Sequence, residues 1–187
     1  MRKIILFMMV SLDGYVEGVD HDLSWHNVDG EFNEFAAKQM SEAGTILFGR
    51  KTYQLMENYW PSKSGLEDDR IVANLMNTTP KVVFSHSLEK VVETNIWKNV
   101  TLVKNNITEK IQQVKQENEK DIFVLGSNNL CVSLLEHNLL DEVRLMVNPI
   151  VIGEGTPLFL GIKTRQNLTL ATTRVFNNGN VLLTYNR

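Results

Sequence analysis

Short apolar runs alternate along most of the chain with segments of helical periodicity. The apolar runs are rich in Ile, Val, Leu and Phe, and they occupy residues 3–10, 45–49, 81–85, 100–104 and 121–126. Turn residues bound each run, and most runs are apolar at consecutive rather than alternate positions. This pattern is typical of strands in a sheet that is covered on both faces.

Between these runs, apolar residues recur every three or four positions, which predicts amphipathic helices. The apolar stripes lie at residues 32–40, 71–76, 107–114 and 130–135, and a further helix is expected directly after Gly49. Strands that alternate with helices predict an α/β fold with a largely parallel sheet.

The C-terminal part of the chain has a different pattern. Residues 172–186 read as two strands joined at Asn178-Gly179, which is a strong hairpin signal. Because hairpin strands are antiparallel, the sheet is expected to be mixed, with an antiparallel hairpin at its C-terminal end.

Composition fits this picture and excludes several classes of protein. The chain has 187 residues, of which 43% are hydrophobic and 22% charged, so we expect residues 1–187 to form one domain. A net charge of −3 without basic runs argues against binding to nucleic acid, while a small anionic ligand needs only a local basic spot.

The single cysteine, Cys131, cannot form an internal disulfide, which favours a reducing cytoplasm. The N-terminal apolar run of about eight residues reads as a strand rather than a signal peptide, and no run reaches the ~18 residues of a membrane span.

Candidate chemistry lies where the predicted strands end. In an open α/β sheet, ligands bind beyond the carboxyl ends of the parallel strands. Four junctions fall at such ends: "VSLDGYVEG" (10–18), "FGRKTY" (48–53), "FSHS" (84–87) and "VLGSNNL" (124–130). These four junctions could converge on one crevice.

The junction "FGRKTY" combines features that suit a phosphate. Gly49 allows a ligand to approach the backbone closely, and the helix that follows presents free N–H groups and a positive dipole end. Arg50 and Lys51 add positive charge, and Thr52 adds a hydroxyl donor. The same residues also suit a plain strand-to-helix turn with solvated charges.

The junction "VLGSNNL" follows the same logic. Gly126 ends a strand, and Ser127 or Asn128 can cap the next helix, so a second helix N-terminus points toward the expected crevice. Taken singly, these residues are explained somewhat better by a glycine chosen for the turn and a serine chosen for the cap. No G-x-G-x-x-G motif occurs, which argues against an ordinary Rossmann domain.

The remaining loops carry individually weaker candidates. Ser85 and His86 could hydrogen-bond a ribose or a phosphate, or they could be ordinary loop residues. Asp13 could donate a proton or hold a substrate, although Asp-Gly turns are common. Trp25 could form one wall of a pocket or belong to the core. The four histidines and the single cysteine have no metal-ligand spacing, so no metal site is expected.

Four segments in the same order as in a known family carry a resemblance over nearly the whole chain. They are "SLDGYVEG", "LFGRKTY", "VVFSHSL" and "DIFVLGSNNLCVSLLEHNLLDEVRLMVNPIVIGEGTPLF". Together they resemble the dihydrofolate reductase-like superfamily, and more closely the reductase domain of the bifunctional riboflavin-biosynthesis deaminase-reductase. The resemblance implies a three-layer α/β fold, in which helices flank a mixed, mostly parallel sheet with an antiparallel C-terminal hairpin.

The resemblance also implies a cofactor, NADPH, and residues that meet it. The implied cofactor residues are Gly49, Arg50, Lys51 and Thr52 at the first helix, Ser85 and His86 near the adenosine, and Gly126, Ser127 and Asn128 at the pyrophosphate. Trp25 would lie near the nicotinamide and help to close the pocket, and Asp13 would orient the substrate or relay a proton. A small-molecule substrate, a pterin-like C=N bond or a ring-opened ribose on a pyrimidine, and a homodimer built with the C-terminal strands are further expectations.

The chain departs from the family pattern in three ways. Gly126-Ser127 stands where dihydrofolate reductases have adjacent glycines, and only Asp29 and Glu31 approximate their proton-donating carboxylate. The chain also leaves no room for a zinc-binding deaminase domain. We therefore expect a stand-alone NADPH-dependent reductase, with a catalytically silent NADPH- or nucleotide-binding module, acting as a sensor or partner-binding protein, as the alternative.

Overall fold

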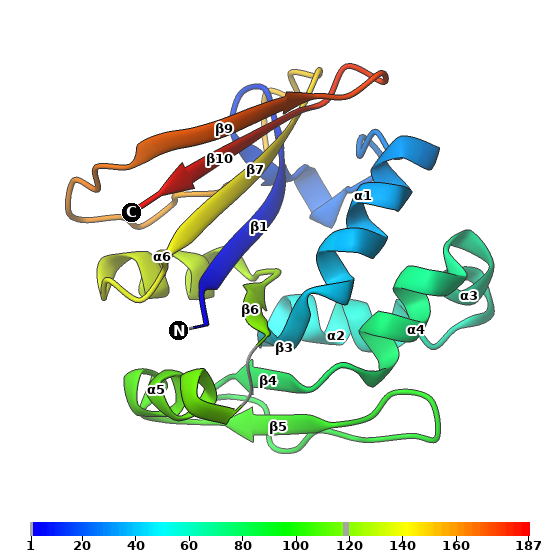
Figure 1. The fold of residues 1–187 in the computed structure, drawn as a ribbon, viewed down its shortest axis with the longest axis vertical. Coiled ribbons are helices and arrows are strands. Elements are labelled where there is room, and N and C mark those ends of the chain that lie inside the picture. Colours follow the sequence, from blue (N-terminus) through cyan, green and yellow to red (C-terminus); the bar gives the residue numbers. More distant parts are fainter. Residues whose placement is uncertain (1, 118–119) are drawn as a thin grey trace.

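The computed structural model describes residues 2–117 and 120–187. An eight-stranded sheet runs through the molecule in the order β5-β4-β3-β6-β1-β7-β10-β9 (Figure 1). Its strands are β1 (Ile4–Ser11), β3 (Ala43–Gly49), β4 (Lys81–Phe84), β5 (Val100–Val103), β6 (Asp121–Val124), β7 (Glu142–Asn148), β9 (Thr169–Val175) and β10 (Val181–Asn186). The strands from β5 to β7 pair in parallel, whereas β10 pairs antiparallel with both β7 and β9.

Helices cover both faces of this sheet and make three layers (Figure 1). The helices are α1 (Gly30–Ser41), α2 (Arg50–Tyr59), α3 (Lys63–Asp68), α4 (Arg70–Thr78), α5 (Ile107–Glu117) and α6 (Asn128–Glu136), and a single 3-10 turn, η1, spans Val19–His21. Core residues of α1, α2 and α4 pack on one face, and those of α5 and α6 pack on the other. The central strand β3 is buried at every position, which explains its consecutive apolar residues.

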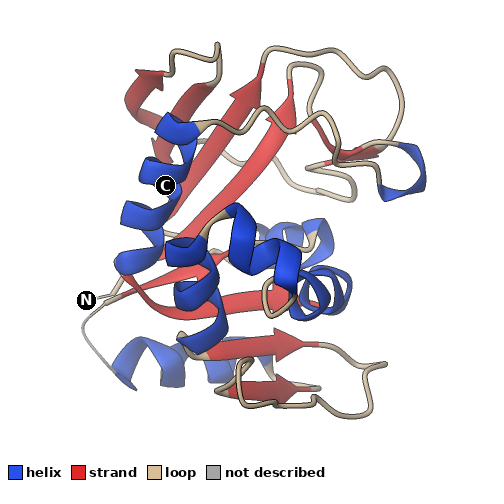
Figure 2. Cartoon of the chain, turned by 90° about the vertical axis from the view of Figure 1, so that its right-hand side faces the viewer, coloured by secondary structure: helices blue, strands red, loops and turns tan. Residues whose placement is uncertain are grey.

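The predicted fold class is confirmed, and so is the C-terminal hairpin, in which the N–H of Gly179 donates to the carbonyl of Phe176 at 3.0 Å. Two small features were not predicted. The polar stretch 61–70 contains the short helix α3, which begins where the Ser62 hydroxyl accepts from the N–H of Gly65. A separate two-stranded antiparallel sheet joins β2 (Tyr15–Glu17) to β8 (Thr156–Pro157), beyond the ends of the parallel strands (Figure 2).

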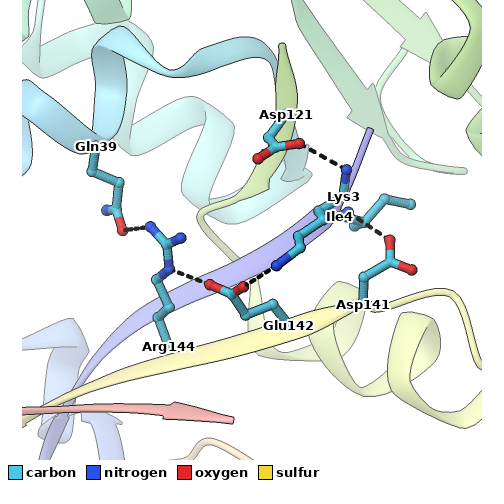
Figure 3. Close-up of polar contacts among 7 residues, drawn as sticks. All are labelled: Lys3, Ile4, Gln39, Asp121, Asp141, Glu142 and Arg144. Atoms are coloured by element: carbon cyan, nitrogen blue, oxygen red, sulfur yellow. Dashed lines mark hydrogen bonds and ion pairs between the residues drawn. The ribbon is translucent and has the colours of Figure 1, made fainter. Parts of the chain in front are cut away.

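A polar network links residues at the amino ends of β1 and β7 with α1 (Figure 3). Glu142, which is only 5% exposed, accepts from Lys3 at 2.9 Å and from Arg144 at 2.6 Å. Arg144 also donates to the side chain of Gln39 in α1 at 3.0 Å, so a helix, β1 and β7 share one network. Each buried charge therefore has partners, as burial of charges requires.

The helices that follow β3 and β6 indicate where a ligand can bind. These neighbouring parallel strands send their helices to opposite faces, α2 after β3 and α6 after β6. In open α/β sheets, such a switch point opens a crevice at the carboxyl ends of the strands. Within the described residues, no helix is long and apolar enough to cross a bilayer.

Candidate cofactor and substrate site

Two helix N-termini meet at the switch point between β3 and β6. The N–H of Gly49, the residue before α2, donates to the carbonyl oxygen of Gly126, just before α6, at 2.8 Å. A Cβ on Gly49 would overlap the Ser127 hydroxyl, and a Cβ on Gly126 would lie 2.8 Å from Thr52 Oγ1. Gly126 also has a φ of +113°, which L side chains rarely adopt. Only glycines at both positions allow the two helices to begin this close to each other.

Both of these helix ends lack the side-chain caps found elsewhere in the molecule. Asp29, Ser62 and Asp69 accept hydrogen bonds from the first N–H groups of α1, α3 and α4. Neither Gly49 nor Ser127 caps its helix with a side chain, and neither α2 nor α6 has an acidic residue in its first turn. The expected Ser127 cap is therefore not formed. The free N–H groups and positive dipole ends of α2 and α6 both suit an anion.

Polar side chains next to the two helix ends are available for a ligand. Within the described part of the chain, the hydroxyls of Thr52 and Ser127 and the amide of Asn128 form no hydrogen bond. Arg50 and Lys51 are exposed at the start of α2, where Arg50 donates to Gln54 at 3.3 Å. Two cations at a helix N-terminus oppose the helix dipole, so a bound anion would offset an unfavourable local charge.

Ser85 and His86 follow β4, one strand away from Gly49. The Ser85 hydroxyl accepts from the N–H of Leu88 at 3.0 Å and so forms a local turn. His86 is exposed. The structure thus brings Gly49, Thr52, Gly126 and Ser127 together, while Ser85 and His86 lie beside them at the neighbouring strand end.

Asp13 is occupied by the chain itself. Its two carboxylate oxygens accept from the N–H of Ile152 at 3.2 Å and of Gly153 at 2.8 Å, which holds the 150–156 loop against the end of β1. Hydrogen bonds from the Ser11 hydroxyl and from these N–H groups lower the pKa of this carboxyl. Asp13 is therefore ionised at neutral pH, and its carboxylate anchors the 150–156 loop.

Trp25 lies half-buried in the loop between η1 and α1, outside the hydrophobic core. Its ring meets that of His26 edge-on at 4.5 Å, and its Nε1 donates to the carbonyl of Asp22 at 3.0 Å. Residues 24–27 and 149–150 line a hollow of about 320 Å³. Trp25 is therefore one of the residues that line this hollow.

Four buried or half-buried asparagines fix the backbone that carries Trp25. The Asn148 side chain accepts from the N–H of Asn27 at 2.8 Å, and Asn27 donates to the Asn178 carbonyl at 2.7 Å. Asn180 donates to the Asn27 carbonyl at 2.7 Å. The end of β7 and the C-terminal hairpin therefore position this loop from opposite sides, although no local sequence signal identified these residues.

The two approximate proton-donor candidates serve structural roles. Asp29 caps α1 by accepting from the N–H of Phe32 at 2.8 Å. Glu31 accepts from the N–H of Asn177 and from Arg174, both at 2.9 Å, and these contacts lower the pKa of its carboxyl. Asp29 thus caps α1, and Glu31 joins α1 to the C-terminal hairpin.

His26 and the pair Glu17–His21 are polar features that sequence reasoning missed. Burial lowers the pKa of His26 to about 4, against a smaller opposing effect of Asp22, and its Nε2 has no partner in the described chain. Residues 18–21 and 154–156 form a second hollow, of about 400 Å³, next to the β2–β8 sheet. The one sequence feature that could have drawn attention to these histidines was their closeness to Trp25 along the chain.

The mixed sheet with helices on both faces has the dihydrofolate reductase-like α/β fold. The model of the family described as "RibD C-terminal domain" matches residues 2–182. The chain belongs to this RibD C-terminal domain family. Membership supports an oxidoreductase role.

Relatives and solved structures agree with this assignment. The chain is 33% identical to uncharacterized protein YyaP of Bacillus subtilis (strain 168) over 186 residues, which are 98% of this chain and 94% of YyaP. It is 26% identical to uncharacterized protein YwjB of the same organism over 176 residues, covering 94% of this chain and 92% of YwjB.

The structural comparisons concern the fold. A crystal structure of a putative riboflavin biosynthesis protein from Shewanella sp. PV-4 has a TM-score of 0.76 at 22% identity, covering 99% of this chain and 98% of the other. The Thermotoga maritima diaminohydroxyphosphoribosylaminopyrimidine deaminase/5-amino-6-(5-phosphoribosylamino)uracil reductase has a TM-score of 0.71 at 15% identity, covering 99% of this chain and 56% of that one.

Proposed function

We propose that the chain is a reductase that uses NADPH to reduce a small molecule, either a pterin-like compound or a ring-opened ribose attached to a pyrimidine. The observation that carries the proposal is the pair of uncapped helix N-termini at the β3/β6 switch point. They are joined through Gly49 and Gly126 and bordered by Arg50 and Lys51. A dinucleotide has several phosphates, and this arrangement offers separate N–H groups and positive charges for them.

The residues present fit such a cofactor on chemical grounds. Gly49 and Gly126 leave no Cβ between the two helix ends, so backbone N–H groups are open to phosphate oxygens. Thr52 and Ser127 would add hydroxyl donors, Arg50 would pair with a phosphate, and Asn128 would add an amide. When bound, NADPH supplies the hydride, while this chain binds, orients and shields the reacting molecules.

The substrate would occupy the side of the crevice formed by the loops beyond β1 and β7. Trp25 offers an aromatic wall that is suited to a planar ring, and the asparagine contacts around Asn27 hold this wall in place. Asp13 contributes by fixing the loop at Ile152 and Gly153. Such a preorganised wall would hold the acceptor carbon for hydride transfer and exclude water.

One observation favours a second candidate, a nucleotide-binding module without catalysis. Asp13, Asp29 and Glu31 are all engaged by backbone N–H groups, so none of these carboxylates is free to protonate a reduced substrate. A module that binds NADPH as a sensor would need no such group.

Cofactor titration followed by an acceptor screen tests the proposal and separates these candidates. NADPH and NADH binding would be followed by dihydronicotinamide fluorescence. NADPH oxidation would then be measured with pterins, ribosylaminopyrimidines, quinoid compounds and nitro compounds. Binding of NADPH with turnover of at least one acceptor is expected. Binding without any turnover favours the sensor module, and absence of binding contradicts both.

A further inference from the structure

A histidine–glutamate pair borders the hollow formed by residues 18–21 and 154–156. His21 Nδ1 lies 2.8 Å from Glu17 Oε2, and Glu17 Oε1 accepts from the Thr156 hydroxyl at 2.8 Å. The glutamate side chain is 23% exposed, whereas that of His21 is 64% exposed. One nitrogen of the His21 ring is therefore held by a carboxylate fixed within the β2–β8 sheet, while its Nε2 has no partner in the described chain.

This hollow lies at the same edge of the molecule as the candidate cofactor site. The η1 turn and β2 follow the carboxyl end of β1, and β8 follows the loop after β7 (Figure 2). Gly155 brings the two segments together, because a Cβ there would overlap the carbonyl oxygen of Glu17. The same loop, 18–27, carries both His21 and the pocket wall at Trp25.

The proposed reduction requires a proton, and four titratable side chains of these loops are poor proton donors at neutral pH. Hydride addition to a C=O or C=N bond leaves a negative charge on oxygen or nitrogen. Hydrogen bonds lower the pKa values of Asp13, Asp22 and Glu31, so these carboxyls are ionised at neutral pH. Burial lowers the pKa of His26 to about 4, so this imidazole is neutral, and a poor proton donor, at neutral pH.

We propose that His21, oriented by Glu17, donates this proton to the reduced substrate. The inference rests on the proposed reductase function and supplies the proton donor that the reduction requires. The acceptor carbon gains the hydride, and the electron pair of its double bond moves to oxygen or nitrogen. That atom takes the proton from His21 Nε2, forming a new O–H or N–H bond, and water reprotonates the neutral imidazole. Because Glu17 holds Nδ1, the proton that the imidazolium carries on Nε2 is the one left for a substrate.

The backbone conformation of His21 determines which substitution can test its role. His21 has a φ of +63°, and asparagine tolerates this left-handed conformation better than glutamine or alanine. His21→Asn therefore removes the proton donor with little backbone strain. Glu17→Gln keeps the histidine and removes the orienting charge. His137→Asn is the matched control, because His137 is an exposed histidine at the far end of α6 whose Nδ1 contacts the Ser133 carbonyl.

The test compares NADPH affinity, kcat and the pH profile of kcat for these variants, using an acceptor that the wild-type chain reduces. In His21→Asn we expect kcat to fall about 100-fold and its decline toward alkaline pH to disappear, with unchanged NADPH affinity. Glu17→Gln should lower kcat about 10-fold, and His137→Asn should match the wild type.

Each other outcome has a definite consequence. Wild-type kcat and pH profile in folded His21→Asn would overturn the proton-donor role and leave the reductase function standing. Loss of NADPH affinity together with kcat would also overturn it, because the loop would then act structurally. If His21→Asn does not fold, an unchanged kcat in Glu17→Gln would overturn the proposal that Glu17 orients His21 as the proton donor. A wild-type chain that binds NADPH and reduces no acceptor overturns the reductase function and this inference together.

Discussion

The backbone N–H of Gly49 donates to the carbonyl oxygen of Gly126 across a distance of 2.8 Å, and this bond links the starts of two helices that leave the sheet on opposite faces. It connects the two loops that form the candidate cofactor site. Because neither glycine can gain a side chain without contacting the other loop, the close approach of the two loops depends on these two positions.

Alanine at either glycine is expected to weaken both stability and cofactor binding. A Cβ at position 49 would overlap the Ser127 hydroxyl, and one at position 126 would contact Thr52 Oγ1 at a φ of +113°. Gly49→Ala and Gly126→Ala should each lower the free energy of unfolding by about 1–3 kcal/mol, measured by urea denaturation. NADPH affinity should fall at the same time.

Gly30→Ala is the matched control for these variants. A Cβ on Gly30, at the start of α1, meets no atom within 4 Å, and the position is helical. Alanine there should leave NADPH binding unchanged and should not lower stability. Equal effects at positions 30, 49 and 126 would contradict the role of the glycine contact.

Removal of the cations at the start of α2 is expected to have opposite effects on stability and on binding. Arg50 and Lys51 lie at the positive end of a helix that has no acid in its first turn. In Arg50→Gln and Lys51→Gln, the ligand-free protein should be as stable as the wild type or more stable by about 0.3–1 kcal/mol. NADPH should bind roughly 10-fold more weakly to Arg50→Gln, because one charge-assisted hydrogen bond to phosphate is lost. Thermal unfolding with and without NADPH measures both effects.

Lys63→Gln is a suitable control for the loss of one positive charge. Lys63 is an exposed lysine at the start of α3, whose N-terminus Ser62 caps. The NADPH affinity of Lys63→Gln should equal that of the wild type. A ligand-free Arg50→Gln protein that is less stable but binds NADPH normally would assign Arg50 a structural role only.

Local sequence patterns were sufficient to predict the fold and one half of the site. Consecutive apolar residues identify strands that are buried on both faces, and the glycines that end β3 and β6 mark where helices begin. Because parallel strands share one carboxyl edge, Gly49 and Gly126 were expected near one crevice, and the structure brings them into contact.

The other half of the site depends on contacts between residues far apart in the sequence. Asp13 reads as a turn residue, and only the folded chain places Ile152 and Gly153 against its carboxylate. Glu31 likewise reads as a free acid in the first turn of α1, while Arg174 and the N–H of Asn177 engage it in space. Single-sequence patterns contain no information on such pairings, so the roles of these carboxylates could not be predicted.

Asp13→Asn is expected to loosen the loop that follows β7. Asparagine retains the size of the side chain but has one carbonyl oxygen where aspartate offers two acceptors, so one of the N–H groups of Ile152 and Gly153 loses its partner. We expect faster hydrogen exchange at these two amides, a higher KM for the acceptor and an unchanged NADPH affinity. Unchanged exchange at residues 152 and 153 would contradict the anchoring role.

The wild-type Asp13 contribution should also depend on pH in a defined direction. Its pKa in the folded protein is lowered from the ordinary value of 3.8, so its contribution to stability is present above that pH. The contribution is lost as the pH falls through the folded-state pKa. The stability difference between wild type and Asp13→Asn should therefore shrink in acid.

His26 is expected to make the protein sensitive to mild acid. Burial lowers its pKa from 6.5 to about 4, so between these values the unfolded chain binds a proton that the folded chain does not. The free energy of unfolding should therefore decrease as the pH falls from about 6.5 to about 4, by an amount on the order of 1–3 kcal/mol.

His26→Gln has no such titration, and its stability should decrease less over this range. Urea denaturation of both proteins at about pH 7 and about pH 4.5 measures the difference, with exposed His86→Gln as the control. Because residues 24–27 line the hollow beside Trp25, fluorescence of that tryptophan should report whether the acid effect begins in this loop. Equal pH dependence in wild type and His26→Gln would mean that other groups cause the acid sensitivity.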